Sequence, residues 1–346
     1  MFVLKIKKKT IFLCLSFILF GALLVFFMNR FFYVGAQENK KIIKYAEFGP
    51  TYEALEKAMN EDVKSQTEDI KINWIEVLAI LGAKYGGDFK KYKSADMNAI
   101  FKKLKAGTSA AEISKNTKSY EYFKEVYSAV LGEFLGKYKI RKKSKDGQSQ
   151  GEWQEAYGLK VFSPIAKTYP FSHYDDFGAS RSYGYSRPHL GHDMMAATGT
   201  PVIAVESGTV EIMGWNRYGG WRVGIRSFDK KRYYYYAHLR QNRPFHVDLK
   251  EGSLVKAGDV IGYVGRTGYS SKENVNNINE SHLHWGMQLI FDESQKECDN
   301  EIWIDLYAIT KLLEKNKSAV IRNNDTREFY SDFEFSELNL EKNGLY

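Results

Sequence analysis

Histidine is the residue type whose distribution in this chain points to chemistry. The chain has 346 residues and 7 histidines, and all of these lie between His173 and His284. Two groups stand out, His189-Leu190-Gly191-His192-Asp193 and His282-Leu283-His284. Zinc accepts neutral imidazole nitrogen and carboxylate oxygen, and a catalytic zinc site has three such ligands and one open position. The two groups therefore predict a zinc site.

The spacing within each group suits a shared metal ion. In a loop or tight turn, a spacing of four can aim His189 and Asp193 at one ion, and Gly191 between them permits the bend. On a strand, His282 and His284 would point to the same face, so both imidazoles can reach one site. The two groups can thus contribute to a single centre.

A third candidate lies between the two groups. His238 ends the aromatic run Tyr233–Ala237, and we interpret it as a catalytic side chain at the end of a strand. A lone histidine is more often an ordinary surface or core residue than a ligand. We expect that ordinary role for the remaining histidines, His173, His192 and His246.

The sequence around these histidines predicts β-strands as the elements that position them. From about Trp153, short β-branched or aromatic runs alternate with glycines at close spacing, which predicts an antiparallel all-β domain. A closing helix is expected at Trp303–Glu314, and a charged, loosely held tail after Lys315. The expected strands are Val202–Val205, Thr209–Met213, Arg222–Arg226, Arg232–Ala237, Val260–Val264 and Leu283–Leu289.

Residues 45–140 predict helices instead. Apolar residues recur there at i, i+3, i+4 and i+7, as in Trp74, Val77, Leu78 and Leu81, which is typical of helices with one buried face. We expect a small helical bundle that acts as a spacer or docking domain. Lys139–Gly151 is polar and basic and contains Ser and Gly, so it predicts a linker.

The N-terminal residues predict a membrane anchor. Ile11–Met28 is uncharged and near the lower length limit for a spanning helix. The lysines before it, Lys5, Lys7, Lys8 and Lys9, favour a cytoplasmic N-terminus and a single-pass protein with its catalytic domain outside the cell membrane.

A cleaved signal peptide is the alternative, because Val34-Gly35-Ala36 has small residues that suit a cleavage site. The apolar run, however, exceeds the usual roughly 7–15 residues of a signal peptide core.

Composition narrows the choice of partners. The formal net charge is +8, which suits nucleic acid, anionic lipid or an anionic polymer. No nucleic-acid motif accompanies this charge, so we expect affinity for a negatively charged envelope, with a merely solvated basic surface as the alternative. The 2 cysteines are Cys14 and Cys298, and Cys14 lies in the apolar run, so no disulfide is expected.

Residues of about 160 to 291 resemble the lysostaphin-type metallopeptidases, the M23 or LytM-like family. The resemblance implies an all-β zinc endopeptidase of the bacterial cell wall, in which His189, Asp193 and His284 bind Zn2+. It implies that His238 and His282 are the unligated catalytic pair, and either could be the general base. The motifs are His189-x-Gly191-x-Asp193, Gly199-Thr200-Pro201-Val202, Tyr236-Ala237-His238-Leu239, Thr267-Gly268 and His282-Leu283-His284.

The sequence also departs from the family. The approach to the second histidine pair, Asn276–Ser281, is long and polar, and Trp285-Gly286 stands where many members have an aromatic residue followed by Glu. We expect these changes to alter the cleft walls and the substrate preference, not the metal site.

The expected organisation has four parts. They are a cytoplasmic tail and transmembrane anchor (1–37), a helical spacer or docking domain with its linker (38–150), an M23-like metallopeptidase domain (151–315) and a charged tail (316–346). The expected function is cleavage of peptide cross-links or stem peptides of peptidoglycan, and an envelope protein could be a further partner.

Two rival functions are weighed against this one. The first is a non-catalytic M23-like scaffold or wall-binding protein, for example in a sporulation complex. The second is a self-inhibited enzyme in which the loop Phe171–Tyr183, with His173, Asp175 and Asp176, supplies a fourth metal ligand. We expect that loop to be a surface turn.

Overall fold

The computed structural model describes residues 43–144, 147–184, 186–296, 298 and 300–337, and the statements below concern these residues. The predicted anchor Ile11–Met28 and the alternative cleavage site lie outside them. None of the helices within the described ranges has the length and apolar character needed to cross a membrane. From Lys44 onward the described residues form one compact unit. Cys298 is a free thiol in this unit.

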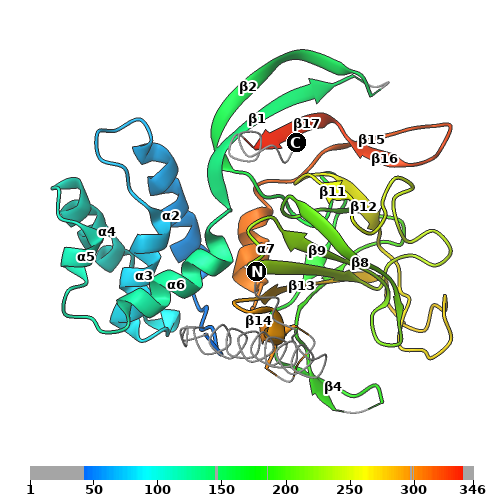
Figure 1. Cartoon of the computed structure of the whole chain (residues 1–346), viewed down its shortest axis with the longest axis horizontal. Helices are drawn as coiled ribbons and strands as arrows, with labels where there is room; N and C mark the ends of the chain where they lie inside the picture. The colour runs from blue at the N-terminus through cyan, green and yellow to red at the C-terminus, as the bar shows by residue number, and fades with distance from the viewer. Residues whose placement is uncertain (1–42, 145–146, 185, 297, 299, 338–346) are drawn as a thin grey trace, which may run out of the picture. The chain divides into compact units, whose positions relative to one another are not determined.

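The helices of the N-terminal half begin and end at residues suited to those positions. Thr51 Oγ1 accepts a hydrogen bond from the backbone N–H of Ala54, and Asn73 Oδ1 accepts one from Ile75 (2.9 Å), so both cap a helix N-terminus. Gly86 follows the second helix with φ 61°, a left-handed conformation that glycine adopts readily. The elements, grouped together in blue and cyan in Figure 1, are α2 (Tyr52–Ser65), α3 (Trp74–Tyr85), η1 (Phe89–Lys91), α4 (Ser94–Lys105), α5 (Ala110–Ile113) and α6 (Tyr120–Leu131).

A β-hairpin occupies the place of the predicted linker, and the C-terminal residues pair with it. The strands β1 (Leu135–Lys143) and β2 (Ser149–Leu159) are antiparallel, and β17 (Phe333–Glu337) lies on the other side of β1. Tyr138 packs on Phe335 with their ring centroids 5.4 Å apart. The prediction of a linker at Lys139–Gly151 is therefore wrong, and so is that of a loosely held tail as far as residue 337, where the described residues end.

The linker prediction failed because apolar and charged residues alternate along β1, and the many charged residues hid this strand pattern. Tyr138 and Ile140 pack against the buried Phe333 and Phe335, while the lysines and arginine between them point to the other face of β1. Phe333 and Phe335 also pack on Phe162, so the two strands join a core cluster of the β domain although they are nearly two hundred residues apart in sequence. Two short strands precede this C-terminal strand, β15 (Val320–Arg322) and β16 (Phe329–Ser331), and pair with each other.

The predicted antiparallel β domain is confirmed, and its main sheet carries the histidines. In the described residues its strands follow the order β11-β8-β9-β10-β13-β6-β3, with β14 also paired to β13. These strands are β3 (Ser172–His173), β6 (His192–Met195), β8 (Gly208–Asn216), β9 (Gly220–Ser227), β10 (Arg232–Ala237), β11 (Leu254–Val255), β13 (His282–Leu289) and β14 (Ile302–Trp303).

Smaller elements complete this unit. The pairs β7–β12 and β4–β5 are antiparallel, and α7 lies within the predicted closing helix. A second short helix, η2, begins with an Asp292 capping box. Their bounds are β4 (Ser180–Arg181), β5 (Arg187–Pro188), β7 (Pro201–Ile203), β12 (Val260–Tyr263), η2 (Glu293–Gln295) and α7 (Tyr307–Leu313).

A buried ion pair joins the main sheet to the helices. Arg232 on β10 is 0% exposed, and its Nε and Nη2 donate to the two carboxylate oxygens of Glu206 at 2.8 and 3.0 Å. Its Nη1 donates to the backbone oxygen of Ala129 in α6 at 2.6 Å. The hydroxyl of Tyr234 also donates to Glu206. Glu206 thus neutralises a guanidinium that has no access to water.

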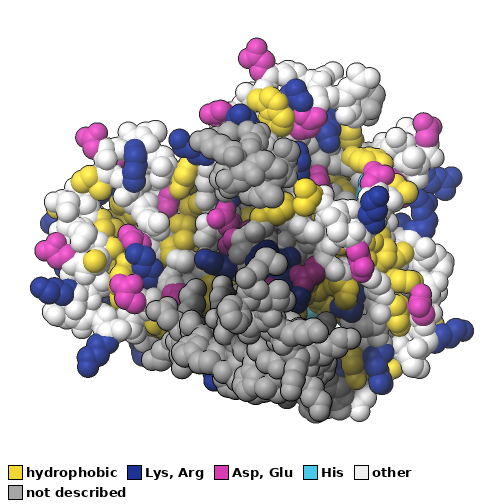
Figure 2. All heavy atoms as spheres, viewed as in Figure 1, with side chains coloured by type: hydrophobic (Ala, Val, Ile, Leu, Met, Phe, Trp, Pro, Cys, Tyr) yellow, Lys and Arg dark blue, Asp and Glu magenta, His cyan; other side chains and the backbone are white. Residues whose placement is uncertain are grey.

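The visible surface mixes both signs of charge. In the view of Figure 2, lysine and arginine side chains are interspersed with aspartate and glutamate side chains over the coloured part of this face. On this face the arrangement agrees with a solvated basic surface better than with one continuous basic patch.

We predict that Glu206→Gln destabilises the protein, because it leaves the buried Arg232 guanidinium without its main counter-charge. Breaking a buried pair from one side costs on the order of 3 kcal/mol of the free energy of unfolding. Glu155→Gln is the matched control, since Glu155 is 66% exposed beside Lys139 and its loss should cost about 0–1 kcal/mol. Urea denaturation of both variants measures the difference, and equal losses would contradict the prediction.

Candidate metal centre

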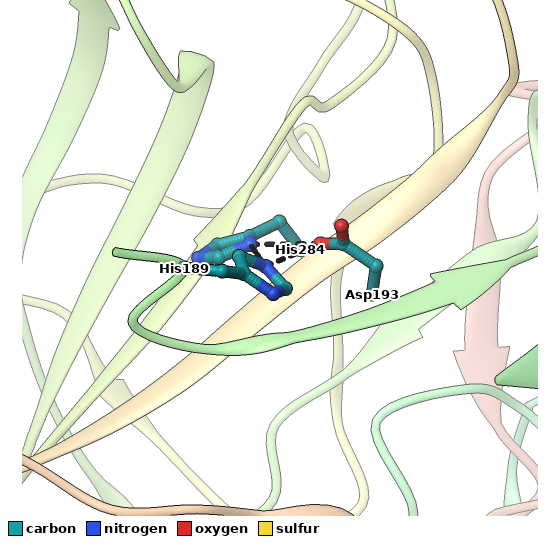
Figure 3. A group of neighbouring side chains, drawn as sticks. All are labelled: His189, Asp193 and His284. Carbon is teal, nitrogen blue, oxygen red and sulfur yellow. Dashed lines mark hydrogen bonds and ion pairs between the residues drawn. The ribbon is translucent and has the colours of Figure 1, made fainter. Parts of the chain in front are cut away.

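Three side chains from the two histidine groups meet in the structure. His189 Nε2 lies 3.1 Å from Asp193 Oδ1 and 3.0 Å from His284 Nδ1, and the last two atoms are 2.9 Å apart. Figure 3 shows the three side chains pointing toward one another. Tetrahedral zinc ligands at about 2.0–2.1 Å from the ion lie roughly 3.3 Å apart, so this donor set fits zinc after a small expansion.

Strand pairing brings two of these residues together. The antiparallel register of β6 and β13 sets Asp193 directly opposite His284, so their side chains share one face of the sheet. His189 lies just before β6 and reaches the same point. Gly191 is needed for a reason the sequence did not reveal: a Cβ there would lie 2.5 Å from the His284 ring. The turn is therefore defined by close approach and not by a left-handed bend.

The surroundings of Asp193 and His284 keep both side chains in the protonation state that binds a metal ion, an ionised carboxylate and a neutral imidazole. Burial raises the pKa of Asp193, but hydrogen bonds from His189 and His284 outweigh it, and the net pKa is far below the usual range. Burial lowers the pKa of His284, against a smaller opposing effect of Asp193. The carboxylate is therefore ionised and the His284 imidazole neutral near pH 7.

The other two predicted histidines lie beside this cluster. The ring of His238 is 4.8 Å from that of His282 and 5.8 Å from that of His284. His282 Nε2 is 3.8 Å from Asp193 Oδ1. His238 follows β10 with φ 59°, held by a 2.7 Å bond from its backbone N–H to the oxygen of Gly219. Strained backbone of this kind recurs at functional sites.

Both of these histidines have the same tautomer. His238 Nδ1 is 2.9 Å from the backbone oxygen of Thr267, and His282 Nδ1 is 2.9 Å from that of Glu280. A carbonyl oxygen only accepts, so each Nδ1 carries the proton and each Nε2 keeps a free lone pair. Burial also lowers the pKa of His238 well below its usual range. Both rings can therefore accept a proton at Nε2.

A loop before β6 supports the cluster, and the sequence did not reveal how. His189 Nδ1, the nitrogen that faces away from the cluster, donates to the backbone oxygen of Asp176 at 3.3 Å and lies 3.2 Å from Asp176 Oδ1. Arg181 Nη2 donates to Asp176 Oδ2 at 2.5 Å and to Asp193 Oδ2 at 3.2 Å. A carboxylate on the far nitrogen of a metal-ligating histidine fixes its tautomer and strengthens it as a ligand.

This loop does not supply a fourth ligand within the described residues, where the metal-binding group consists of His189, Asp193 and His284. Asp176 contacts the back of His189 instead, and His173 Nδ1 lies 2.7 Å from His192 Nε2. The loop is thus more than the expected surface turn, because it braces the cluster.

The remaining histidines lie outside the cluster, as expected. His192 points to the opposite face of β6 from Asp193, and burial, with His173 beside it, lowers its pKa to about 3. His246 is buried beside Tyr330 and accepts a hydrogen bond from the backbone N–H of Asp248.

A cleft of about 480 Å³ opens beside the cluster. His189, Asp193, His284 and His238 form part of its lining, and further residues come from β4, β5, β8, β9, β10, β13, β14 and nearby loops. The volume suits several residues of an extended peptide. The arrangement therefore combines a metal-binding cluster, two proton acceptors and an elongated cleft.

The sequence and the fold were compared with known proteins. The sequence model of Peptidase family M23 matches residues 187–297. Over 124 residues the chain is 40% identical to the L-Ala--D-Glu endopeptidase of Bacillus subtilis (strain 168), covering 36% of each chain. Over 98 residues it is 37% identical to lysostaphin of Staphylococcus simulans, covering 28% of this chain and 17% of that one.

A solved structure extends the likeness in fold. A Ruminococcus gnavus protein named for the glycyl-glycine endopeptidase lytM superposes with a TM-score of 0.50 at 21% identity, covering 80% of this chain and 92% of that one. This likeness concerns the fold alone. The comparisons support the M23, LytM- and lysostaphin-like family for the β-rich part of the chain. Peptidases of that family are zinc metallopeptidases, which agrees with the predicted cofactor and with the donor set found here.

We predict a graded loss of zinc affinity. Asp193→Ala removes a predicted ligand and should abolish stoichiometric zinc. Asp176→Asn keeps all three predicted ligands but removes the negative charge behind His189 and the ion pair with Arg181, so it should weaken binding about 10- to 100-fold. Asp175→Asn is the matched control, because the neighbouring Asp175 is exposed. Competition with a chromophoric chelator gives each dissociation constant. Equal affinity of the Asp176 and Asp175 variants would show that the brace has no role.

Proposed function

We propose that this chain is a zinc-dependent endopeptidase that cleaves peptide bonds in bacterial peptidoglycan. One observation carries the proposal: His189, Asp193 and His284 form a metal-binding cluster, and the two proton-accepting rings of His238 and His282 lie directly beside it. The relatives named as L-Ala--D-Glu endopeptidase and as peptidoglycan DD-endopeptidase ShyC of Vibrio cholerae support peptidoglycan as the substrate.

The chemistry of the proposed reaction follows from these side chains. Zinc held by the three ligands would supply Lewis-acid chemistry, polarising a carbonyl and lowering the pKa of water. The Nε2 of His238 or His282 takes the proton of the attacking water as the new C–O bond forms. A proton then passes from one of the rings to the leaving amine nitrogen as the C–N bond breaks. While it carries that proton, the ring can also donate an Nε2–H hydrogen bond to the negative charge that develops on the carbonyl oxygen.

We predict that His238→Ala and His282→Ala keep zinc bound but lose activity. Neither side chain belongs to the predicted ligand set, and a positioned acid or base contributes on the order of 10²- to 10⁴-fold in rate. The measurement is release of peptides from purified peptidoglycan, paired with the zinc content of each variant. His246→Asn is the control, because asparagine can still accept the hydrogen bond from Asp248.

The outcomes separate the proposal from its rival. A non-catalytic scaffold would show no chelator-sensitive cleavage in the wild type and unchanged wall binding when His238 is lost. Wild-type rates in both histidine variants would instead exclude their catalytic role while leaving a zinc peptidase in place. Mass analysis of the released fragments identifies the bond that is cut.

We also propose that the chain is a single-pass membrane protein with its catalytic domain outside the cell. The support is the run Ile11–Met28 with lysines before it. In this arrangement the helices α2–α6 are a spacer or docking region between the membrane and the cleft.

Protease added to intact protoplasts should therefore digest the residues after Val34 and spare the short N-terminal tail. Immunoblots against tags at either end measure this. A β domain that is protected until the protoplasts are lysed would overturn the proposed location. The spared tail also distinguishes an anchor from a cleaved signal peptide, which would leave no tail on the mature chain.

A further inference from the structure

The cleft contains a cationic side chain that the proposed reaction does not use. Four cationic side chains and three acidic ones line the cleft. Most of them are paired with each other or with neighbours. Arg181 donates to Asp176 and Asp193, Glu211 accepts from Arg226 and Lys296, and Glu301 accepts from Trp303. Arg222 on β9 is the exception.

Arg222 has a guanidinium without a protein partner among the residues that the structure describes. Its Nε is shielded from solvent and makes no hydrogen bond there, and no carboxylate of that part of the chain pairs with it. The rest of the side chain is half-buried and lines the cleft. The rest of the guanidinium borders the cleft, so a ligand that approaches there would meet a cation without a counter-charge among the described residues.

The strand register puts Arg222 in line with the metal cluster. Asp193 is opposite His284, and His284 is opposite Ala237. The β9–β10 register pairs Val223 with Tyr236, which puts Arg222 opposite Ala237. Opposed residues of antiparallel strands share a face. Asp193, His284 and Arg222 therefore stand in one row across the floor of the cleft.

The same row gives the distance between the two sites. Neighbouring strands are about 4.8 Å apart, so the backbone of Arg222 is roughly 10 Å from that of His284, two strands away. Ala237, the residue between them in this row, is fully buried, and Arg222 and His284 both line the cleft on either side of it. An extended peptide advances about 3.3–3.6 Å per residue, so the gap spans up to about three residues of substrate.

We propose that Arg222 is a specificity residue that binds a free carboxylate of the substrate within about three residues of the scissile bond. A guanidinium binds a carboxylate through two parallel N–H···O bonds, a geometry that an amide cannot reproduce. The proposal rests on the proposed function and deepens it. The preferred substrate is an acidic stem peptide, because an uncharged glycine cross-bridge offers no carboxylate to this position.

The test compares two peptides that differ in one group. One carries a D-glutamate with a free α-carboxylate beside the cleavable bond, and the other carries the α-carboxamide at the same position. Wild-type enzyme should cleave the carboxylate peptide with a kcat/KM about 10- to 100-fold higher, the worth of a hydrogen-bonded charge. Arg222→Gln should lose this preference through a higher KM, with zinc content unchanged. Arg217→Gln is the matched control, since Arg217 is exposed outside the cleft lining.

Binding measurements keep the subsite testable without turnover. Calorimetry with the zinc-loaded His282→Ala variant should show tighter binding of the carboxylate peptide, and the added Arg222→Gln change should remove the difference. If wild-type enzyme cleaves nothing but this difference in binding is found, the proposed peptidase activity fails and the subsite stands. Equal affinity for both peptides, a preference that survives Arg222→Gln, or faster cleavage of pentaglycine would overturn the subsite while leaving the peptidase intact.

Discussion

The antiparallel pairing of β6 with β13 sets Asp193 opposite His284, and every other feature of the site is arranged around that register. A slip of one residue would turn one of the two side chains to the opposite face of the sheet, because side chains alternate along a strand. The next pair along the ladder, His282 with Met195, fixes the second histidine on the same face as the first. Through β10 the same ladder continues to Arg222. The metal cluster and the cleft floor thus depend on backbone hydrogen bonds of one sheet.

Parts of the chain outside the sheet hold the reactive groups in one state. Backbone oxygens of Thr267 and Glu280 fix the tautomers of His238 and His282, so that each Nε2 keeps its lone pair beside the metal cluster. Asp176 does the same for His189 from the other side. These contacts come from loops and not from strands, which is common where a rigid scaffold positions functional side chains. The loops therefore determine which ring nitrogen of each histidine carries the proton, and the strand pairing alone does not.

The helical region is tied to the sheet by buried polar contacts. Arg232 bridges Glu206 and the backbone of Ala129, and Tyr157 donates to Asp62 in α2 at 2.8 Å. Such contacts are directional and costly to leave unmade, so they favour a fixed arrangement over a free hinge. A rigid connection suits a spacer that would hold the cleft at a set height above a membrane. This role is a proposal.

The sequence by itself determined the β class, the strand that carries His282 and His284, and the five side chains that gather around the metal cluster. It could do so because alternation along a strand and ligand spacing are local properties. The tertiary structure alone decided which strands are neighbours, and so brought Asp176 behind His189 and Arg222 into line with His284. It also turned the charged stretch after Leu135 into a strand, because Ile140 finds its apolar partner in the distant Phe335. Pairings of this kind depend on surfaces far apart in the chain, and no local pattern encodes them.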